Sequence, residues 1–239
     1  MSESVVRHTL RVASRQHGYV TRAQVTAVAS SESAADLALA RASRRGHLER
    51  VARGVYRCVG APALHEARHR TWAAMLAVDS DRDPDGTIPP TLVAFGATAA
   101  LWTDPDAPID PPALVELLAA EPQRTRRTDV RIRGGRLDLA DDDWWVHDGL
   151  GVTTPQRTVE DVADTVGVAA AMRLTERWLR LRVLQDPAPT SKIVADVTAF
   201  LRGDAAATDR LRAGRLGLEQ AARSRNGQRP RQTSSAAIV

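Results

Sequence analysis

The sequence predicts an α+β fold with an N-terminal winged helix-turn-helix, a mixed α/β middle region and a helical C-terminus. The first observation is that residues 20–58 read as two short helices followed by a hairpin, which is the element order of a winged helix-turn-helix. The second is that short apolar runs typical of strands mix with helical patterns between residues 61 and 153. The third is that helical patterns dominate after Thr154.

The N-terminal elements follow from local signals. Apolar residues at helical spacing predict a first helix over Ser4–His17, and Gly18 would end it. Thr21 is expected to begin the next helix, because Gln24 three residues later completes a reciprocal capping box.

The second helix of the pair and the hairpin are predicted in the same way. Ser33 is expected to begin the helix and Gly46 to end it, since glycine readily adopts the left-handed backbone that follows many helices. The alternating runs Leu48–Val51 and Val55–Cys58 then form the hairpin. Gly54 supplies the positive φ that a tight turn requires.

On a helical wheel the helix beginning at Ser33 has an apolar face and a basic face. Ala35, Ala38, Leu39 and Ala42 are assigned to the core. The opposite face could enter a groove of DNA, because arginine pairs with guanine edges and with phosphates. The alternative is a solvated basic helix packed on a larger domain. The residues predicted to contact DNA are Thr21, Arg22, Ser33, Leu37, Ala40, Arg41, Arg44, Arg45, Arg50, Arg53 and Arg57.

Charge changes sign along the chain and supports a domain boundary near Gly60-Ala61-Pro62. Residues 1–60 contain 10 arginines and 4 acids, residues 61–170 contain 10 arginines and 19 acids, and residues 171–239 contain 13 basic residues and 6 acids. We therefore expect a winged DNA-binding domain at 1–60, an α/β and helical domain at 61–224 and a disordered tail at 225–239. The acidic middle is expected to meet a basic protein rather than phosphates.

Beyond residue 60 the apolar patterns predict a series of short elements. Trp144 and Trp145 should point to opposite faces of their strand, so that one is buried. Helices are expected at His65–Val78, from Thr98 to Trp102, from Thr154-Pro155 to Val166, at Val168–Leu184, at Pro189–Arg202 and at Ala207–Ala222. Strands are expected from Thr91, at Leu114–Leu118, at Val130–Arg133 and at Trp144–Val146, and an exposed loop at Asp79–Pro90.

Several classes of site and location are disfavoured. The single Cys58 excludes an internal disulfide and a multi-cysteine metal site. His65-Glu66-Ala67-Arg68-His69 has the H-E-x-x-H spacing of zinc hydrolases, but Arg68 puts a cation between the two histidines and no third ligand has a diagnostic spacing. No cofactor is expected. No apolar run approaches the length of a membrane span and no signal peptide is visible, so we expect a soluble cytoplasmic protein.

Three stretches of the chain, GHLERVARGVYR, GATAALW and DGLGVTTPQRTVEDVA, occur in the order found in AbiEi-type antitoxins of type IV toxin–antitoxin systems, which the sequence resembles. Gly54-Val55-Tyr56 matches the Gly-Val-Tyr at the wing of that family. Thr154-Pro155-Gln156-Arg157-Thr158 with Asp161 matches an element that opens a later helix. Arg157 and Asp161, four residues apart, would form an ion pair across one helical turn or contact a toxin.

The resemblance implies a transcriptional autorepressor that binds inverted repeats upstream of its own operon. It also implies an antitoxin, not an enzyme, that neutralises a cognate nucleotidyltransferase toxin. Repeated half-sites need two winged domains, so binding to DNA is expected to be cooperative or dimeric. The alternative is a winged-helix protein with a Vsr-like endonuclease C-terminal domain, for which only Asp141-Asp142-Asp143 and Lys192 offer the acids and the lysine of a nuclease site.

Overall fold

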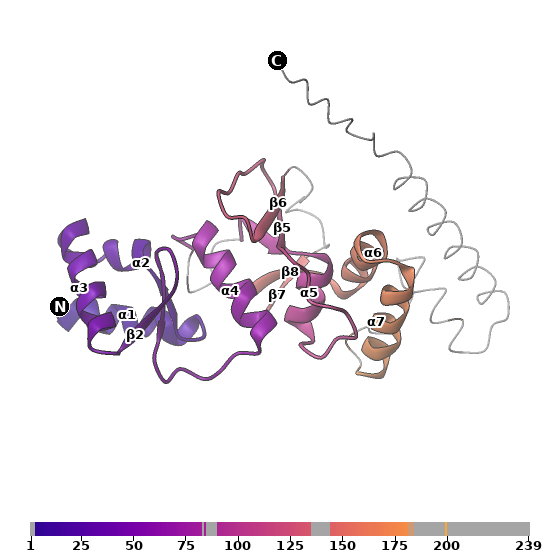
Figure 1. Ribbon diagram of the computed structural model, residues 1–239, viewed down its shortest axis with the longest axis horizontal. Helices are drawn as coiled ribbons and strands as arrows, with labels where there is room; N and C mark the ends of the chain where they lie inside the picture. Colours follow the sequence, from indigo (N-terminus) through magenta and orange to yellow (C-terminus); the bar gives the residue numbers. More distant parts are fainter. Residues whose placement is uncertain are drawn as a thin grey trace, which may run out of the picture.

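The computed structural model describes residues 3–82, 84, 90–134, 144–181, 183 and 199. Its described part is elongated, with the N-terminal helices at one end, a five-stranded sheet in the middle and two helices at the other end (Figure 1). The helices predicted beyond residue 184, the tail at 225–239, Asp141-Asp142-Asp143 and Lys192 all lie outside the described residues.

The N-terminal part is a winged helix-turn-helix, as predicted. Its small sheet is antiparallel with the order β1-β3-β2, and β1 pairs Thr21 with Val55. The elements are α1 Glu3–Arg15, β1 Tyr19–Thr21, α2 Arg22–Thr26, α3 Glu32–Arg44, β2 Leu48–Ala52 and β3 Val55–Cys58.

The local signals are confirmed with one correction. Thr21 and Gln24 form the capping box in both directions, and Gly46 and Gly54 have φ values of +71° and +74°. The predicted start of α3 was wrong by two residues, because the N-cap is Ser31 and not Ser33. The Ser31 hydroxyl accepts a hydrogen bond from the Ala34 backbone N–H at 3.1 Å, and the local run of serines offered more than one residue able to cap.

The middle of the chain forms a mixed sheet with the order β6-β5-β4-β8-β7. Strand β4 is central, antiparallel to β5 and parallel to β8. Strands β5 and β6 are parallel, whereas β7 and β8 form a hairpin whose turn residues Asp148 and Gly149 both have positive φ. The elements are α4 Glu66–Val78, β4 Leu92–Ala94, α5 Gly96–Thr103, β5 Val115–Ala119, β6 Val130–Gly134, β7 Trp144–His147, β8 Leu150–Thr153, α6 Pro155–Thr165 and α7 Val168–Arg180.

Most of the predicted middle elements are present within one or two residues of their expected bounds. Trp145 is 38% exposed while Trp144 packs against the cluster that contains Phe95, so the two faces were predicted correctly. Thr154 is the N-cap residue of α6 with Pro155 in the first turn, although its hydroxyl makes no capping hydrogen bond. Strands β1 and β8 were not predicted.

The winged part and the middle part share one hydrophobic core. Tyr19 and Val55 from the small sheet belong to the same buried cluster as Trp72 on α4 and Trp102 on α5. The two indole rings stack with centroids 5.5 Å apart, and the Trp72 Nε1–H donates to the Gln16 carbonyl oxygen at 3.1 Å. The small sheet is therefore covered on one face by its own helices and on the other by α4.

The connection after β3 is tied to the winged part. The Arg57 guanidinium donates to the carbonyl oxygens of Ala61 and Pro62, and Gly18 lies directly against Ala61. The boundary at residue 60 remains a prediction, but a fragment cut there would expose Tyr19 and Val55, both of which are completely buried in the whole chain.

A second core forms between α5, α6 and α7. Its largest side chain is Trp178, which is completely buried. Beside it the Arg177 guanidinium makes two hydrogen bonds to Asp104, which follows α5. None of the helices in the described ranges is long and apolar enough to cross a bilayer.

Candidate nucleic-acid interface

The exposed face of α3 carries most of the residues predicted to contact DNA. Ala35, Ala38 and Leu39 are buried, so the apolar half of the helix faces the core as predicted. Leu37 is 46% exposed on the other half. The exposed set on α3 and just after it is Ser33, Leu37, Ala40, Arg41, Arg44 and Arg45. This helix is the third of the fold and occupies the position of a recognition helix.

Arg22, at the start of α2, is committed to an ion-pair network with α3. Its Nε and Nη2 donate to the two carboxylate oxygens of Asp36 at 2.6 and 3.0 Å, and Nη2 also reaches Glu32 at 3.1 Å. These bonds lower the pKa of Asp36, so the carboxylate stays charged. The network fixes α3 relative to α2, but it also places two acids beside the predicted DNA surface and neutralises Arg22.

The wing presents arginine at its tip. Arg53 is exposed in the turn between β2 and β3, and Gly54 beside it has a φ of +74°. Arg50 is also exposed, and its Nε lies 3.4 Å from the Ala52 carbonyl oxygen. Within the part of the chain that the structure describes, the side chains of Arg41, Arg45 and Arg53 make no hydrogen bond or ion pair. Three guanidinium groups are thus available to phosphates or base edges.

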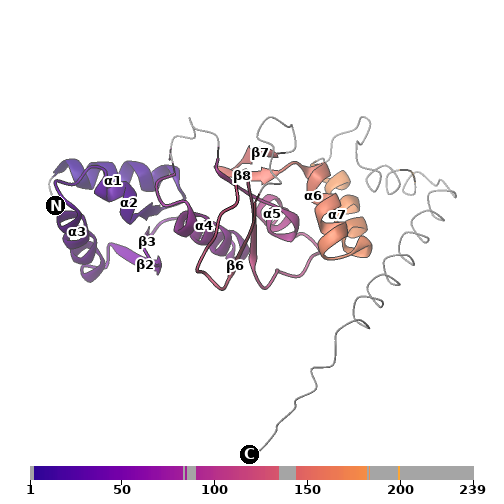
Figure 2. The same cartoon turned by 90° about the horizontal axis from the view of Figure 1, so that it is seen from above.

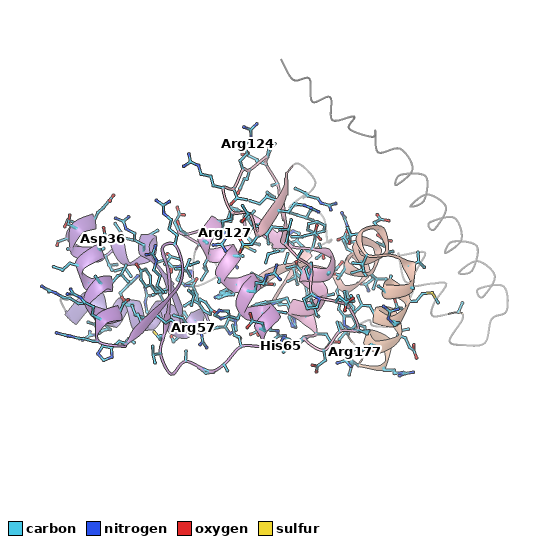
Figure 3. All side chains as sticks on the ribbon, in the orientation of Figure 1. Asp36, Arg57, His65, Arg124, Arg127 and Arg177 are labelled. Atoms are coloured by element: carbon cyan, nitrogen blue, oxygen red, sulfur yellow. The ribbon has the colours of Figure 1, made fainter. Side chains whose placement is uncertain are left out.

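Two of the predicted residues do not reach this surface. Thr21 is completely buried, because its hydroxyl caps α2 and donates to the Ser80 carbonyl oxygen. Side chains alternate along a strand, and Arg57 shares the sheet face of Tyr19, with its guanidinium 5.6 Å from the centre of that ring. It lies toward the connection to α4, well away from Asp36 on α3 (Figure 3).

The histidines of the H-E-x-x-H stretch have structural roles. His65 is the N-cap of α4, and its Nδ1 accepts from the Ala67 backbone N–H at 3.4 Å. His69 lies in α4 beside the small sheet, where its Nδ1 bonds to the Tyr19 hydroxyl. No cluster of three or more metal-ligating side chains is present among the described residues.

Among the described residues of the middle and C-terminal parts, the buried carboxylates Glu116 and Asp104 and the half-buried Asp161 each bind arginine. The pairs are Glu116 with Arg131 and Arg133 at 3.2 and 3.4 Å, Asp161 with Arg157 at 3.0 Å, and Asp104 with Arg177 at 2.9 Å. Burial raises the pKa of Asp161, and its arginine partner opposes that shift. Arg157 and Asp161 therefore form the intrahelical ion pair that their spacing predicted.

Together, three helices, a β-hairpin wing and a basic exposed face on α3 define the winged helix-turn-helix class of DNA-binding regulators. Residues 9–59 match the family model described as transcriptional regulator, AbiEi antitoxin. The match runs from within α1 to one residue past β3, so the winged part of this chain is similar to that of AbiEi-type regulators.

Two further comparisons bear on the whole chain. The crystal structure of the RV2827C protein from Mycobacterium tuberculosis is similar over 89% of this chain and 82% of its own, with 16% sequence identity and a TM-score of 0.44. No curated protein matches the chain.

Proposed function

We propose that this protein represses transcription of its own operon and acts as an antitoxin against a cognate nucleotidyltransferase toxin in the cytoplasm. The DNA-binding half rests on three exposed arginines, Arg41 on α3, Arg45 just after it and Arg53 on the wing, whose side chains pair with no described residue. All three lie within the residues that match the AbiEi family model. The antitoxin half rests on the family description alone. No catalytic step is part of the proposal.

In this mechanism α3 enters the major groove and the wing contacts the adjacent backbone or minor groove. Arg41 and Arg44 read base edges, because they lie on the exposed face that approaches the groove. Arg53 neutralises phosphate. Two copies bind the half-sites of an inverted repeat, so that binding is cooperative or dimeric.

The test of operator binding uses the full chain and its own promoter. Replacing Arg41 or Arg44 by Ala is expected to cost about 1–3 kcal/mol of binding free energy and to relax sequence preference. Replacing Arg53 by Ala is expected to weaken specific and scrambled duplexes alike and to flatten the salt dependence. If the folded triple variant Arg41→Ala/Arg44→Ala/Arg53→Ala retards its promoter as the wild type does, this assignment is wrong.

The antitoxin half is tested by co-expression with the nucleotidyltransferase encoded in the neighbouring gene. Growth restored by the full chain, and restored equally by the triple arginine variant, is the expected result, because neutralisation is assigned to residues beyond the winged part. Failure of the full chain to restore growth refutes the antitoxin role. A neighbouring methyltransferase or repair operon would favour the alternative, a Vsr-like endonuclease.

A further inference from the structure

The connection between β5 and β6 is an unusual feature of the middle part. Parallel neighbours are usually joined through a helix, because the chain must return along the sheet before the second strand begins. Here residues 120–129 make that return without a helix or strand. We call this segment the β5–β6 strap.

The base of the strap is fixed against the sheet. A Cβ on Gly134, the last residue of β6, would lie only 2.4 Å from the Pro122 Cα, so the strap backbone approaches the strand as closely as glycine permits. At its far end Arg127 makes two hydrogen bonds to Asp129 at 3.0 and 2.6 Å. The residues between these anchors are held at the surface.

The strap and the strand after it are basic, although the region around them is acidic. Residues 61–170 have a net charge of −9, yet residues 121–133 contain five arginines and two acids. Three of these arginines are in ion pairs, Arg127 with Asp129 and both Arg131 and Arg133 with Glu116. Arg124 and Arg126 are exposed and make no hydrogen bond or ion pair with any residue that the structure describes. The acidic average of the segment had led us to expect no contact with phosphates.

Viewed from above, the strap lies along the same edge of the molecule as α3 and β2 (Figure 2), and in the view of Figure 1 it stands above both of them. Arg124 projects away from the ribbon at the top of the sheet (Figure 3). Because the winged part and the middle part share a core, this arrangement is fixed and not a consequence of a flexible linker.

We propose that Arg124 and Arg126 on the β5–β6 strap bind the phosphate backbone of the duplex that α3 and the wing engage. Duplex DNA is stiff over the length of a protein and carries one negative charge per about 1.7 Å, so a duplex seated on α3 continues past the wing. Unpaired arginines on a fixed strap can neutralise phosphates there without reordering. The proposal rests on the proposed operator binding and extends that surface to the middle part.

The experiment measures operator affinity of the full chain as a function of salt. The double variant Arg124→Ala/Arg126→Ala removes two phosphate contacts, each of which contributes about 0.9 to the slope of log affinity against log salt. The loss of affinity between about 50 and about 200 mM salt should therefore become about 12-fold smaller than in the wild type. Specific and scrambled duplexes should be affected alike, because phosphate contacts carry no sequence information.

The matched control removes two arginines at the opposite end of the molecule. Arg173→Ala/Arg180→Ala on α7 changes the net charge equally and should leave the salt slope unchanged. A duplex shortened at the end beyond the wing should lack the phosphates that the strap binds. The wild type and the Arg124→Ala/Arg126→Ala variant should therefore have nearly the same affinity and salt slope on this shortened duplex.

The outcomes separate this proposal from the one on which it rests. If the wild type binds its promoter and Arg41→Ala weakens binding, but the strap variant matches the α7 control, the strap does not contact DNA and operator binding stands. If the strap variant binds DNA normally but no longer neutralises the toxin, the strap contacts protein and this proposal is overturned. If the wild type binds no duplex, both proposals fall.

Discussion

Replacing Gly18 by Ala tests how rigidly the winged part is joined to the connection that leads into α4. Gly18 has a φ of +89°, and an added Cβ would lie 2.3 Å from the Cβ of Ala61. Gly60 has nearly the same backbone, with a φ of +84°, but nothing lies within 4 Å of an added Cβ. The two substitutions therefore share the cost of left-handed backbone and differ in the steric clash.

The left-handed backbone costs an L-residue about 1–2 kcal/mol, and this should be the whole effect of Gly60→Ala. Overpacking adds about 1–3 kcal/mol, so Gly18→Ala should lower the free energy of unfolding by about 2–5 kcal/mol. Urea denaturation of the full chain, followed by tryptophan fluorescence, measures both values. Gly46→Ala is a second control, since its φ is +71° and its added Cβ also meets nothing.

A result in which Gly18→Ala and Gly60→Ala destabilise the protein equally would refute the reasoning. It would mean that Ala61 moves away at no cost and that the connection behaves as a hinge.

Three further outcomes are expected from the charges and the thiol. Burial raises the pKa of Asp104, but the Arg177 guanidinium, helped by a hydrogen bond from the Asp106 backbone and by the Trp178 side chain, lowers it overall. Arg177→Met removes the largest of these opposing interactions and raises the Asp104 pKa, so it should destabilise the protein most near neutral pH. The difference in unfolding free energy between variant and wild type, measured by urea denaturation, should narrow as the pH falls from 7 toward 4. Asp36→Asn should tighten DNA binding and steepen its salt dependence in gel-shift titrations, because Arg22 is released toward phosphate. Burial raises the pKa of Cys58, so its alkylation at pH 8 should be slower than that of a small-molecule thiol and should become faster when urea unfolds the protein. The same alkylation rate with and without urea would contradict this prediction.

The elements that were predictable from sequence are those with local causes. The capping box at Thr21, the left-handed glycines at positions 46 and 54 and the start of α6 at Pro155 need only residues close in the chain. The exposed face of α3 was also predictable, because its periodicity already separated the buried alanines from the arginines.

The strands that were not predicted depend on distant contacts. Strand β8 contains Gly151, which by itself disfavours a strand. An added Cβ there would lie 2.9 Å from Pro90 and 3.3 Å from the Leu92 carbonyl oxygen, so glycine is needed for the neighbouring chain to approach. Strand β1 has only three residues and is defined by its pairing with β3.

The candidate site shows the same division. Thr21 was among the residues predicted to contact DNA, yet its hydroxyl donates to the carbonyl oxygen of Ser80, 59 positions away. The neutralisation of Arg22 by Asp36 and the accessibility of Arg124 likewise depend on three-dimensional neighbours. The sequence therefore shows which side chains have the chemistry to bind DNA, while tertiary packing decides which of those side chains are exposed and unpaired.

The burial of Tyr19 and Val55 against α4 limits how this protein could be re-engineered. A chimera spliced at residue 60 would bring a foreign small sheet onto the surface of Trp72, and the mismatch would leave voids or clashes in the core. Moving the splice beyond α4 only transfers the problem to the five-stranded sheet, since α4 packs in the same cluster as Leu92 and Leu117. New operator specificity is thus more readily introduced by side-chain changes on the exposed face of α3 than by exchanging whole segments.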